Sequence, residues 1–412
     1  MDRWLFRWRR LRRELWFRAS LYALLGVAAA LLAVVAAPLV PQAMADRLGG
    51  DSANSILTIL ASSLLAVATF SLGAMVTAYT SMSAAASPRV ASLVTSDEGS
   101  QKALSTFVGA FLYSVVAVTA INAGYYGTKG RSILFLVSAF VVLVVALRLL
   151  AWIERLSRLA TISHIVEKVE ALVRESLDQR RLTSLAAPDP ERGVHGVEVA
   201  AGRTGHVQNI ALDRLQGLAE DLDCRVELLV APGAFVLTGQ PVLRTDLTEC
   251  PEGRLADLRH AIEIGDGRSY EQDPRFGLIV LGEIAGKALS PGVNDPGTAI
   301  SVIRAATRVL DDWSRADTGQ IGHDRLTALP LAASDLLDDV FTPIARDGAG
   351  DLAVAVALQQ ALSALRAGPA DVAACAERLA ASGLARSRRA MTDPDDLRRV
   401  EEARRNVVRR IA

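Results

Sequence analysis

Four long apolar stretches limit what this chain can fold into more than any other feature of its sequence. They lie at about 19–40, 56–79, 104–123 and 133–152, and the roughly 260 residues that follow contain none. Each has about 20 residues, the length of an α-helix that crosses a hydrocarbon core roughly 30 Å thick. The sequence therefore predicts an α-helical membrane protein with four transmembrane helices and a large soluble C-terminal region.

The distribution of arginine predicts the orientation of these helices. Segment 1–18 is rich in arginine, and Arg148, Arg155 and Arg158 lie at or beyond the end of the fourth stretch. Because basic residues are retained on the cytoplasmic side, both termini and the soluble region are predicted to be cytoplasmic. Aromatic residues interleaved with arginine are typical of a segment at the lipid interface. The candidates for contact with the lipid bilayer are Arg3, Trp4, Arg7, Trp8, Arg10, Arg13 and Trp16.

The second stretch differs from the others because small and hydroxylated residues recur along its whole length. They include Ser62, Thr69, Gly73, Thr77 and Thr80. One interpretation is close packing against the other helices, since small residues let helices approach each other. The other is that these residues line a hydrophilic path at the axis of a homo-oligomer, because hydroxyls solvate ions without a buried charge. No ionisable residue lies at the centre of a stretch, which disfavours a proton-coupled transporter.

The fourth helix is expected to continue well beyond the membrane. From Ser132 to about Ala187 the chain contains no proline or glycine, so one helix of roughly 50 residues is predicted. Its extension, 153–187, carries an apolar stripe that includes Ile165, Val169 and Val173. Such a stripe needs a partner, either the chain's own cytoplasmic domain or other copies in a stalk.

A β-rich module is predicted at 188–250, where apolar and polar residues alternate between glycine-containing turns. Within it, APGAFVLTGQPVL resembles the half-motif of lipoyl and biotinyl carrier domains and related barrel-sandwich modules. The expected fold of this part is therefore a small β barrel-sandwich-like module. The carrier lysine is absent, so neither lipoate nor biotin is implied and no cofactor is expected.

The remainder, 251–412, is predicted to be helical and to contain helical hairpins, which makes the C-terminal region α+β. Asp273-Pro274 and Asp295-Pro296 each place an N-cap acceptor before a proline at the first helical position. A capped hairpin explains most polar residues here. The alternative is one polar cluster that binds an ion, an anion or a neighbouring subunit. Its candidate members are Glu271, Asp273, Arg275, Ser290, Asn294, Asp295 and Thr298.

Three motifs carry a resemblance to a known family. They are EQDPRFG at 271–277, ALSPGVNDPGTAI at 288–300, and ASPRV at 86–90 after the second stretch. With them the chain resembles, over essentially its whole length, a family of bacterial predicted membrane proteins catalogued as domain of unknown function 2254. The resemblance implies a multi-pass protein of the bacterial cytoplasmic membrane. It implies no activity and no catalytic residues.

Composition narrows the classes of function. Arginine plus lysine equals aspartate plus glutamate at 45 each, which argues against a nucleic-acid partner. The sequence shows no catalytic motif, and its three cysteines and five histidines have no metal-ligand spacing, so neither an enzyme nor a metal site is expected. Two hypotheses remain. One is a homo-oligomeric channel or pore for ions with a cytoplasmic vestibule. The other is a membrane-anchored scaffold or sensor that presents a cytoplasmic binding domain to an unidentified protein partner.

Overall fold

A computed structural model of the chain describes most of its length. The described residues are 17, 20–24, 26–28, 32, 41–42, 52–85, 87–90, 98–159, 161–182, 185–188, 194–316 and 322–405. The chain divides into two compact units. The first consists of Met1–Ala84 and Pro88–Thr161, and the second of Ala85–Ser87 and Ile162–Ala412.

The first unit contains three long apolar helices: α4 (Ser52–Ala85), α6 (Glu98–Asn122) and α7 (Thr128–Leu159). A short 3-10 turn, η2 (Pro88–Val90), lies between α4 and α6. By length and composition, Ser52–Met82, Gly99–Asn122 and Thr128–Leu156 can each cross a membrane. Three of the four predicted spans are therefore confirmed as long apolar helices. The first predicted span, 19–40, falls mostly outside the described residues, and so does segment 1–18.

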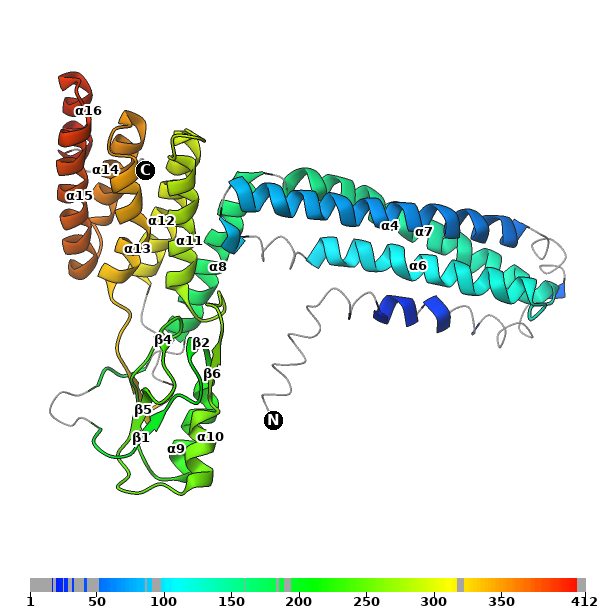
Figure 1. Cartoon of the computed structure of the whole chain (residues 1–412), viewed down its shortest axis with the longest axis horizontal. Coiled ribbons are helices and arrows are strands. Elements are labelled where there is room, and N and C mark those ends of the chain that lie inside the picture. Colours follow the sequence, from blue (N-terminus) through cyan, green and yellow to red (C-terminus); the bar gives the residue numbers. More distant parts are fainter. Residues whose placement is uncertain are drawn as a thin grey trace. The chain divides into compact units, whose positions relative to one another are not determined.

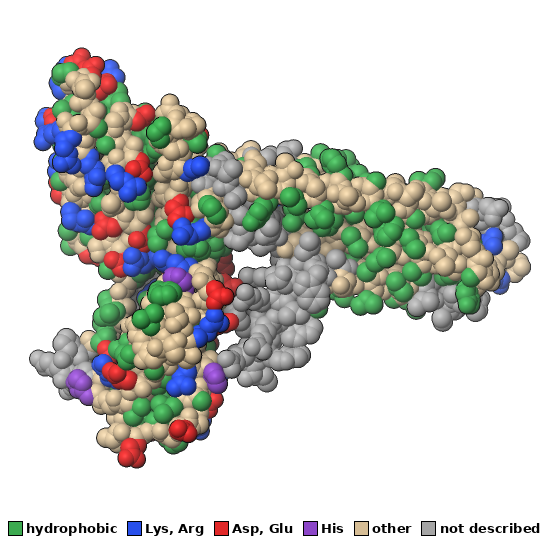
Figure 2. All heavy atoms as spheres, in the orientation of Figure 1, with side chains coloured by type: hydrophobic (Ala, Val, Ile, Leu, Met, Phe, Trp, Pro, Cys, Tyr) green, Lys and Arg blue, Asp and Glu red, His purple; other side chains and the backbone are tan. Residues whose placement is uncertain are grey.

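The core of the first unit lies between α4, α6 and α7. One face of α4 is buried because apolar residues recur on it every three or four positions. One cluster consists of Leu60, Leu64, Ala68, Met75, Ala103, Leu104, Phe107, Ala110 and Trp152. A second consists of Leu57, Tyr113, Ala117, Ile121, Tyr126 and Leu134. On α7, Phe140, Leu143 and Leu147 are exposed, and Figure 2 shows many apolar side chains on the surface of this unit. An exposed apolar surface of this kind suits contact with hydrocarbon.

Two glycines bring the described part of the first predicted span close to α6. Residues 20–24 and 26–28 are helical. A Cβ added at Gly26 would lie 2.7 Å from the carbonyl oxygen of Gly109. Only glycine permits this approach, which is the role that small residues have between membrane helices.

The second unit contains an array of helices (Figure 1). They are α8 (Ile162–Leu182), α11 (Pro274–Ala288), α12 (Pro296–Arg315), α13 (Ala333–Asp347), α14 (Leu352–Leu365), α15 (Ala370–Ala390) and α16 (Pro394–Arg405). Helix α11 packs against α8, α12 and α13, while α14 packs against α12, α15 and α16. The amphipathic pattern explains this packing, because α12 buries Val302, Ile303 and Val309 on one face.

The prediction of one helix from Ser132 to about Ala187 is wrong. Helix α7 ends at Leu159, Thr161 is not helical, and α8 begins at Ile162. The two helices have different patterns: α7 is apolar around its circumference, whereas α8 has a single apolar stripe. Helix α8 buries its stripe where it packs against α11 and α12 of the second unit.

Ion pairs add to this packing of α8. Arg308 of α12 donates to Glu170 at 2.6 Å, and Arg174 is paired with Asp312. Of the two partners considered for the apolar stripe, the structure shows the chain's own C-terminal region, since α8 packs on α11 and α12.

Two small sheets complete the second unit. One has the order β1 (Glu198–Ala200), β5 (Pro241–Thr245), β3 (Val226–Leu228) and β7 (Leu326–Ala328). The other has the order β4 (Phe235–Val236), β2 (Gly205–Ile210) and β6 (Ile262–Gly265). Both sheets and the helices α9 (Leu212–Asp221) and α10 (Glu252–Arg259) contribute residues to one core, among them Val207, Leu215, Leu243 and Leu258.

The predicted α+β class of the C-terminal region is confirmed. The β-rich part nevertheless extends beyond the predicted boundary at 250, because β6 follows it and β7 joins from residue 326. Strand β7 pairs with β3 in parallel, and the other strand pairs are antiparallel.

Candidate functional site

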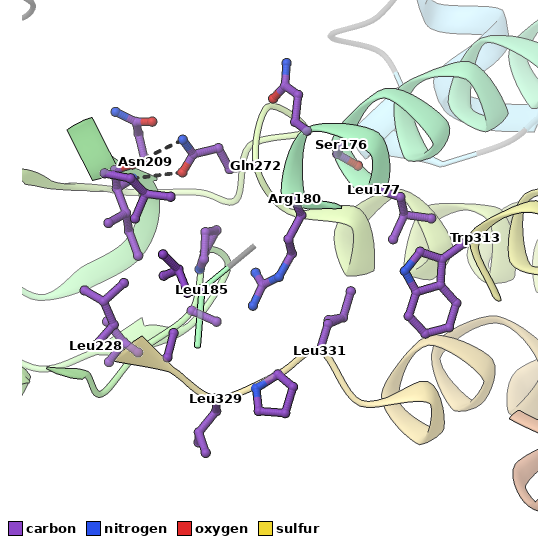
Figure 3. A pocket seen from close by; sticks show the side chains of 18 of the residues that line it. Ser176, Leu177, Arg180, Leu185, Asn209, Leu228, Gln272, Trp313, Leu329 and Leu331 are labelled. Carbon is purple, nitrogen blue, oxygen red and sulfur yellow. Dashed lines mark hydrogen bonds between the residues drawn. The ribbon is translucent and has the colours of Figure 1, made fainter. Parts of the chain in front are cut away.

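A cavity of about 800 Å³ lies within the second unit, where the β-rich part meets the helical array (Figure 3). Its walls come from eight places: α8, Leu185 in the segment after α8, the β2–α9 connection, the segment after β3, Gln272 just before α11, the end of α12, the β7–α13 connection and the start of α15. We call it the Arg180 cavity. Sites for small molecules occur where parts of a fold meet in this way.

The lining of the Arg180 cavity is predominantly apolar. The apolar side chains are Leu177, Leu185, Ile210, Leu212, Leu228, Leu229, Val230, Trp313, Leu329, Leu331 and Val372. Figure 3 shows Leu177, Leu185, Leu331 and Trp313 around the hollow. A predominantly apolar lining lowers the local dielectric constant and so strengthens a polar contact made against it.

Arg180 is the one cation among the described residues that line this cavity. Its guanidinium projects into the hollow (Figure 3). It has no hydrogen-bond or ion-pair partner among the described residues. Burial lowers the pKa of the Arg180 guanidinium, and the Asp273 carboxylate partly opposes that shift.

The position of Arg180 follows from the helical repeat. Val173 and Leu177 are buried on the inner face of α8, and Arg180 follows Leu177 at the i+3 position. The helix therefore directs this arginine toward the same interior as the apolar stripe.

Apart from Asn209, the polar groups near Arg180 have other partners or are exposed. Gln272 is held by the main chain of Ile210, which donates to its Oε1 at 2.9 Å and accepts from its Nε2 at 3.3 Å. Asp213 is bonded to His323 Nε2 at 2.9 Å, and Asp371 lies exposed in the first turn of α15. Asn209 also lines the cavity, and its side-chain amide has no hydrogen-bond partner among the described residues.

The seven residues predicted as one polar cluster form two separate groups. Asp273 and Arg275 lie at the start of α11 with Glu271 just before them. Ser290, Asn294 and Asp295 lie between α11 and α12, and Thr298 lies in the first turn of α12. Because α11 has 15 residues, the groups are separated by roughly 22 Å along its axis.

The first group is built from ion pairs between elements of the fold. Arg268 donates to Asp273 at 2.7 and 2.9 Å, and Asp273 also caps α11 by accepting from Phe276 N at 3.1 Å. Arg275 bridges to Asp339 and Asp335 of α13, each at 2.7 Å. These contacts account for Asp273 and Arg275 as structural residues.

The second group consists of turn and capping residues. Asp295 accepts from Thr298 N at 3.1 Å and from Thr298 Oγ1 at 2.6 Å. Ser290 donates to the carbonyl oxygen of Lys287, and Asn294 has a φ of 49°, which the turn requires. The capped hairpin predicted from the two Asp-Pro motifs is therefore present.

The five candidates for a pore lining are exposed along α4: Ser62, Thr69, Gly73, Thr77 and Thr80. Each of the four hydroxyls donates to the carbonyl oxygen four residues earlier. No atom lies within 4 Å of a Cβ built on Gly73. Neither α6 nor α7 covers this stripe, and the helix itself provides acceptors for its hydroxyls.

The candidate lipid-interface residues, Arg3 to Trp16, lie outside the described residues. Among the described residues, no group of three or more His, Cys, Asp and Glu side chains is placed to hold a metal ion.

The Arg180 cavity itself was not predicted. Its one local signal is the arginine that continues the apolar stripe of α8, because the other walls come from distant parts of the chain.

Comparison with known proteins identifies the family. Uncharacterized proteins of Mycobacterium bovis and Mycobacterium tuberculosis are 26% identical over 364 residues, which cover 82% of this chain and 68% of each relative. No solved structure matches this chain. The family model DUF2254, described as a predicted membrane protein, matches residues 12–364. The resemblance seen in the sequence motifs is therefore confirmed, and the chain belongs to the DUF2254 family of predicted membrane proteins.

Proposed function

We propose that this protein is a membrane-anchored sensor whose second unit binds a small ligand in the Arg180 cavity. The proposal depends on one observation: a mostly apolar cavity of about 800 Å³ that contains an arginine without a partner among the described residues. A large apolar pocket with a few polar groups and a perturbed ionisable residue is the usual composition of a binding site.

The chain connects this cavity directly to the membrane-spanning part. Helix α8 contributes Leu177 and Arg180 to the cavity and begins at Ile162, shortly after α7 ends at Leu159. A ligand that contacts α8 stabilises the arrangement in which that helix is packed. In this proposal the protein lies in the bacterial cytoplasmic membrane, with the second unit in the cytoplasm, and ligand occupancy is transmitted through α8.

Hydrogen exchange of the full-length protein in detergent tests the proposal. Small compounds with an apolar body, either acidic or neutral, are added in turn. At least one is expected to slow exchange in two cavity segments, 176–180 and 209–213. The variant Leu331→Trp, which fills the cavity, is expected to abolish that protection, while Leu237→Trp, at an exposed position outside it, is expected to preserve it. Protection that persists in Leu331→Trp, or none with any compound, contradicts ligand binding there.

A homo-oligomeric ion channel is the second candidate. The observation that favours it is the exposed stripe of Ser62, Thr69, Gly73, Thr77 and Thr80 on α4, since an axial surface must be free on each subunit. It ranks second because hydroxyls bonded to their own helix are also compatible with lipid. Conductance in planar bilayers, altered by Thr77→Lys, is the expected result. A conducting protein that Thr77→Lys leaves unchanged contradicts the axial position of α4.

A further inference from the structure

We infer that the ligand of the Arg180 cavity is a small organic acid that carries a single negative charge on an otherwise apolar body. This inference rests on the proposed ligand-binding function and specifies the chemical class of the ligand. It follows from the charges, the lining and the size of the cavity.

The Arg180 guanidinium suits an anionic ligand, because it has no hydrogen-bonded or ion-paired anion among the described residues. Arginine presents up to five N–H donors in a planar fork, and it remains protonated in the folded protein. A charge moved away from water without a partner is unfavourable, and a carboxylate that accepts two parallel hydrogen bonds removes that penalty. None of the described side chains supplies such a carboxylate to Arg180.

The charges of the lining indicate a monoanion. Among the described lining residues, Arg180 is the one cation, and Asp213 and Asp371 are the anions. A ligand with one negative charge balances Arg180. A phosphate or nucleotide brings further negative charge, for which the described lining residues offer no second cation.

The rest of the lining indicates an apolar body. Aliphatic side chains and Trp313 make up most of the walls, and about 800 Å³ lies within the range of pockets for drug-sized molecules. The Asn209 amide, which also has no partner among the described residues, is the group available for one further hydrogen bond.

Trp313 provides a local probe for the test. The full-length protein contains five tryptophans. We would label them with 5-fluorotryptophan, keep the protein in detergent, and assign the Trp313 signal by Trp313→Phe. The fluorine spectrum would be followed during titration with 4-phenylbutyrate, with the neutral 4-phenylbutyramide, and with inorganic phosphate. The other four signals show whether a compound merely enters the detergent.

The acid is expected to shift the Trp313 signal saturably and to bind about tenfold or more tightly than the amide. That ratio corresponds to one charge-assisted interaction. Phosphate is expected to have no effect, because it has no apolar body. Arg180→Met should weaken binding of the acid about tenfold or more and leave binding of the amide unchanged. Arg180→Lys should retain part of the preference for the acid over the amide.

The control is Arg174→Met, on the same helix but outside the cavity, which should bind the acid as the wild type does. If acid and amide bind equally, or if acid binding is unchanged in Arg180→Met, the ligand is not recognised as an anion. The cavity would then be a site for a neutral ligand. Phosphate binding as tight as that of the acid would contradict the inference that the ligand has an apolar body. No Trp313 shift with any probe removes the inference together with the proposed function. Wild-type protein alone decides the comparison of acid and amide, even if the Arg180 variants do not fold.

Discussion

At the scale of single residues, the Asp-Pro motif occurs at the start of two helices, where its aspartate has different neighbours. Asp273 and Asp295 both cap a helix ahead of a proline. Asp273 is buried and also forms an ion pair with Arg268. Asp295 instead accepts a hydrogen bond from the Thr298 hydroxyl, three residues later. Gly233, with a φ of 89°, lies so near Asp273 that a Cβ there would be 2.1 Å from its Oδ2. The motif determines the cap, and distant residues determine what else the carboxylate does.

Asp273→Ala should therefore destabilise the protein more than Asp295→Ala. Loss of an N-cap costs about 1 kcal/mol. Asp273→Ala also leaves Arg268 without its partner, which brings the expected loss to about 2–4 kcal/mol. Denaturant unfolding of the full-length protein in detergent measures both variants. Equal losses would show that the Arg268 pair contributes nothing to stability.

Asp295 should make a small contribution to stability that depends on pH. Hydrogen bonds from the Thr298 side chain and main chain lower the pKa of Asp295 from its ordinary value of 3.8. A carboxyl group with a lowered pKa stabilises the fold above about pH 4, and this contribution is lost as the pH falls through the folded pKa. The stability difference between wild type and Asp295→Asn should therefore shrink below about pH 4. A difference that stays constant from pH 7 to pH 3 would contradict this assignment.

At the scale of elements, contact between α8 and α11 depends on Gly277. A Cβ added there would lie 2.3 Å from Cγ2 of Val173, which is buried on α8. Gly277→Ala should cost about 1–3 kcal/mol through overpacking. Gly286→Ala, on the same helix with its nearest neighbour at 3.3 Å, should be neutral or stabilising by up to about 1 kcal/mol. In the Val173→Ala background the cost of Gly277→Ala should fall, as a double-mutant cycle would measure. A cost unchanged in that background would place the strain elsewhere.

At the scale of the whole molecule, the second unit begins its main segment at Ile162, directly after Thr161, and also includes Ala85–Ser87. Helix α8 buries its stripe within the second unit, and Ser87 donates a hydrogen bond to Glu283 there. A fragment of residues 162–405 should therefore fold in the absence of detergent and unfold cooperatively, as measured by circular dichroism. Ser87→Ala in the full-length protein should cost no more than about 1 kcal/mol. A fragment that aggregates or lacks cooperative unfolding would show that the first unit is needed for folding.

The sequence by itself determined the features that depend on neighbouring residues. Three apolar spans and the caps at Asp273 and Asp295 were predicted correctly, because span length and N-capping are local properties. Tertiary structure alone decided where α8 separates from α7, since no proline or glycine marks that place and burial of the stripe on α11 and α12 sets it. It also decided that β7 pairs with β3 and that Arg180 faces a cavity. These features join residues far apart in the chain, and local spacing carries no information about such contacts.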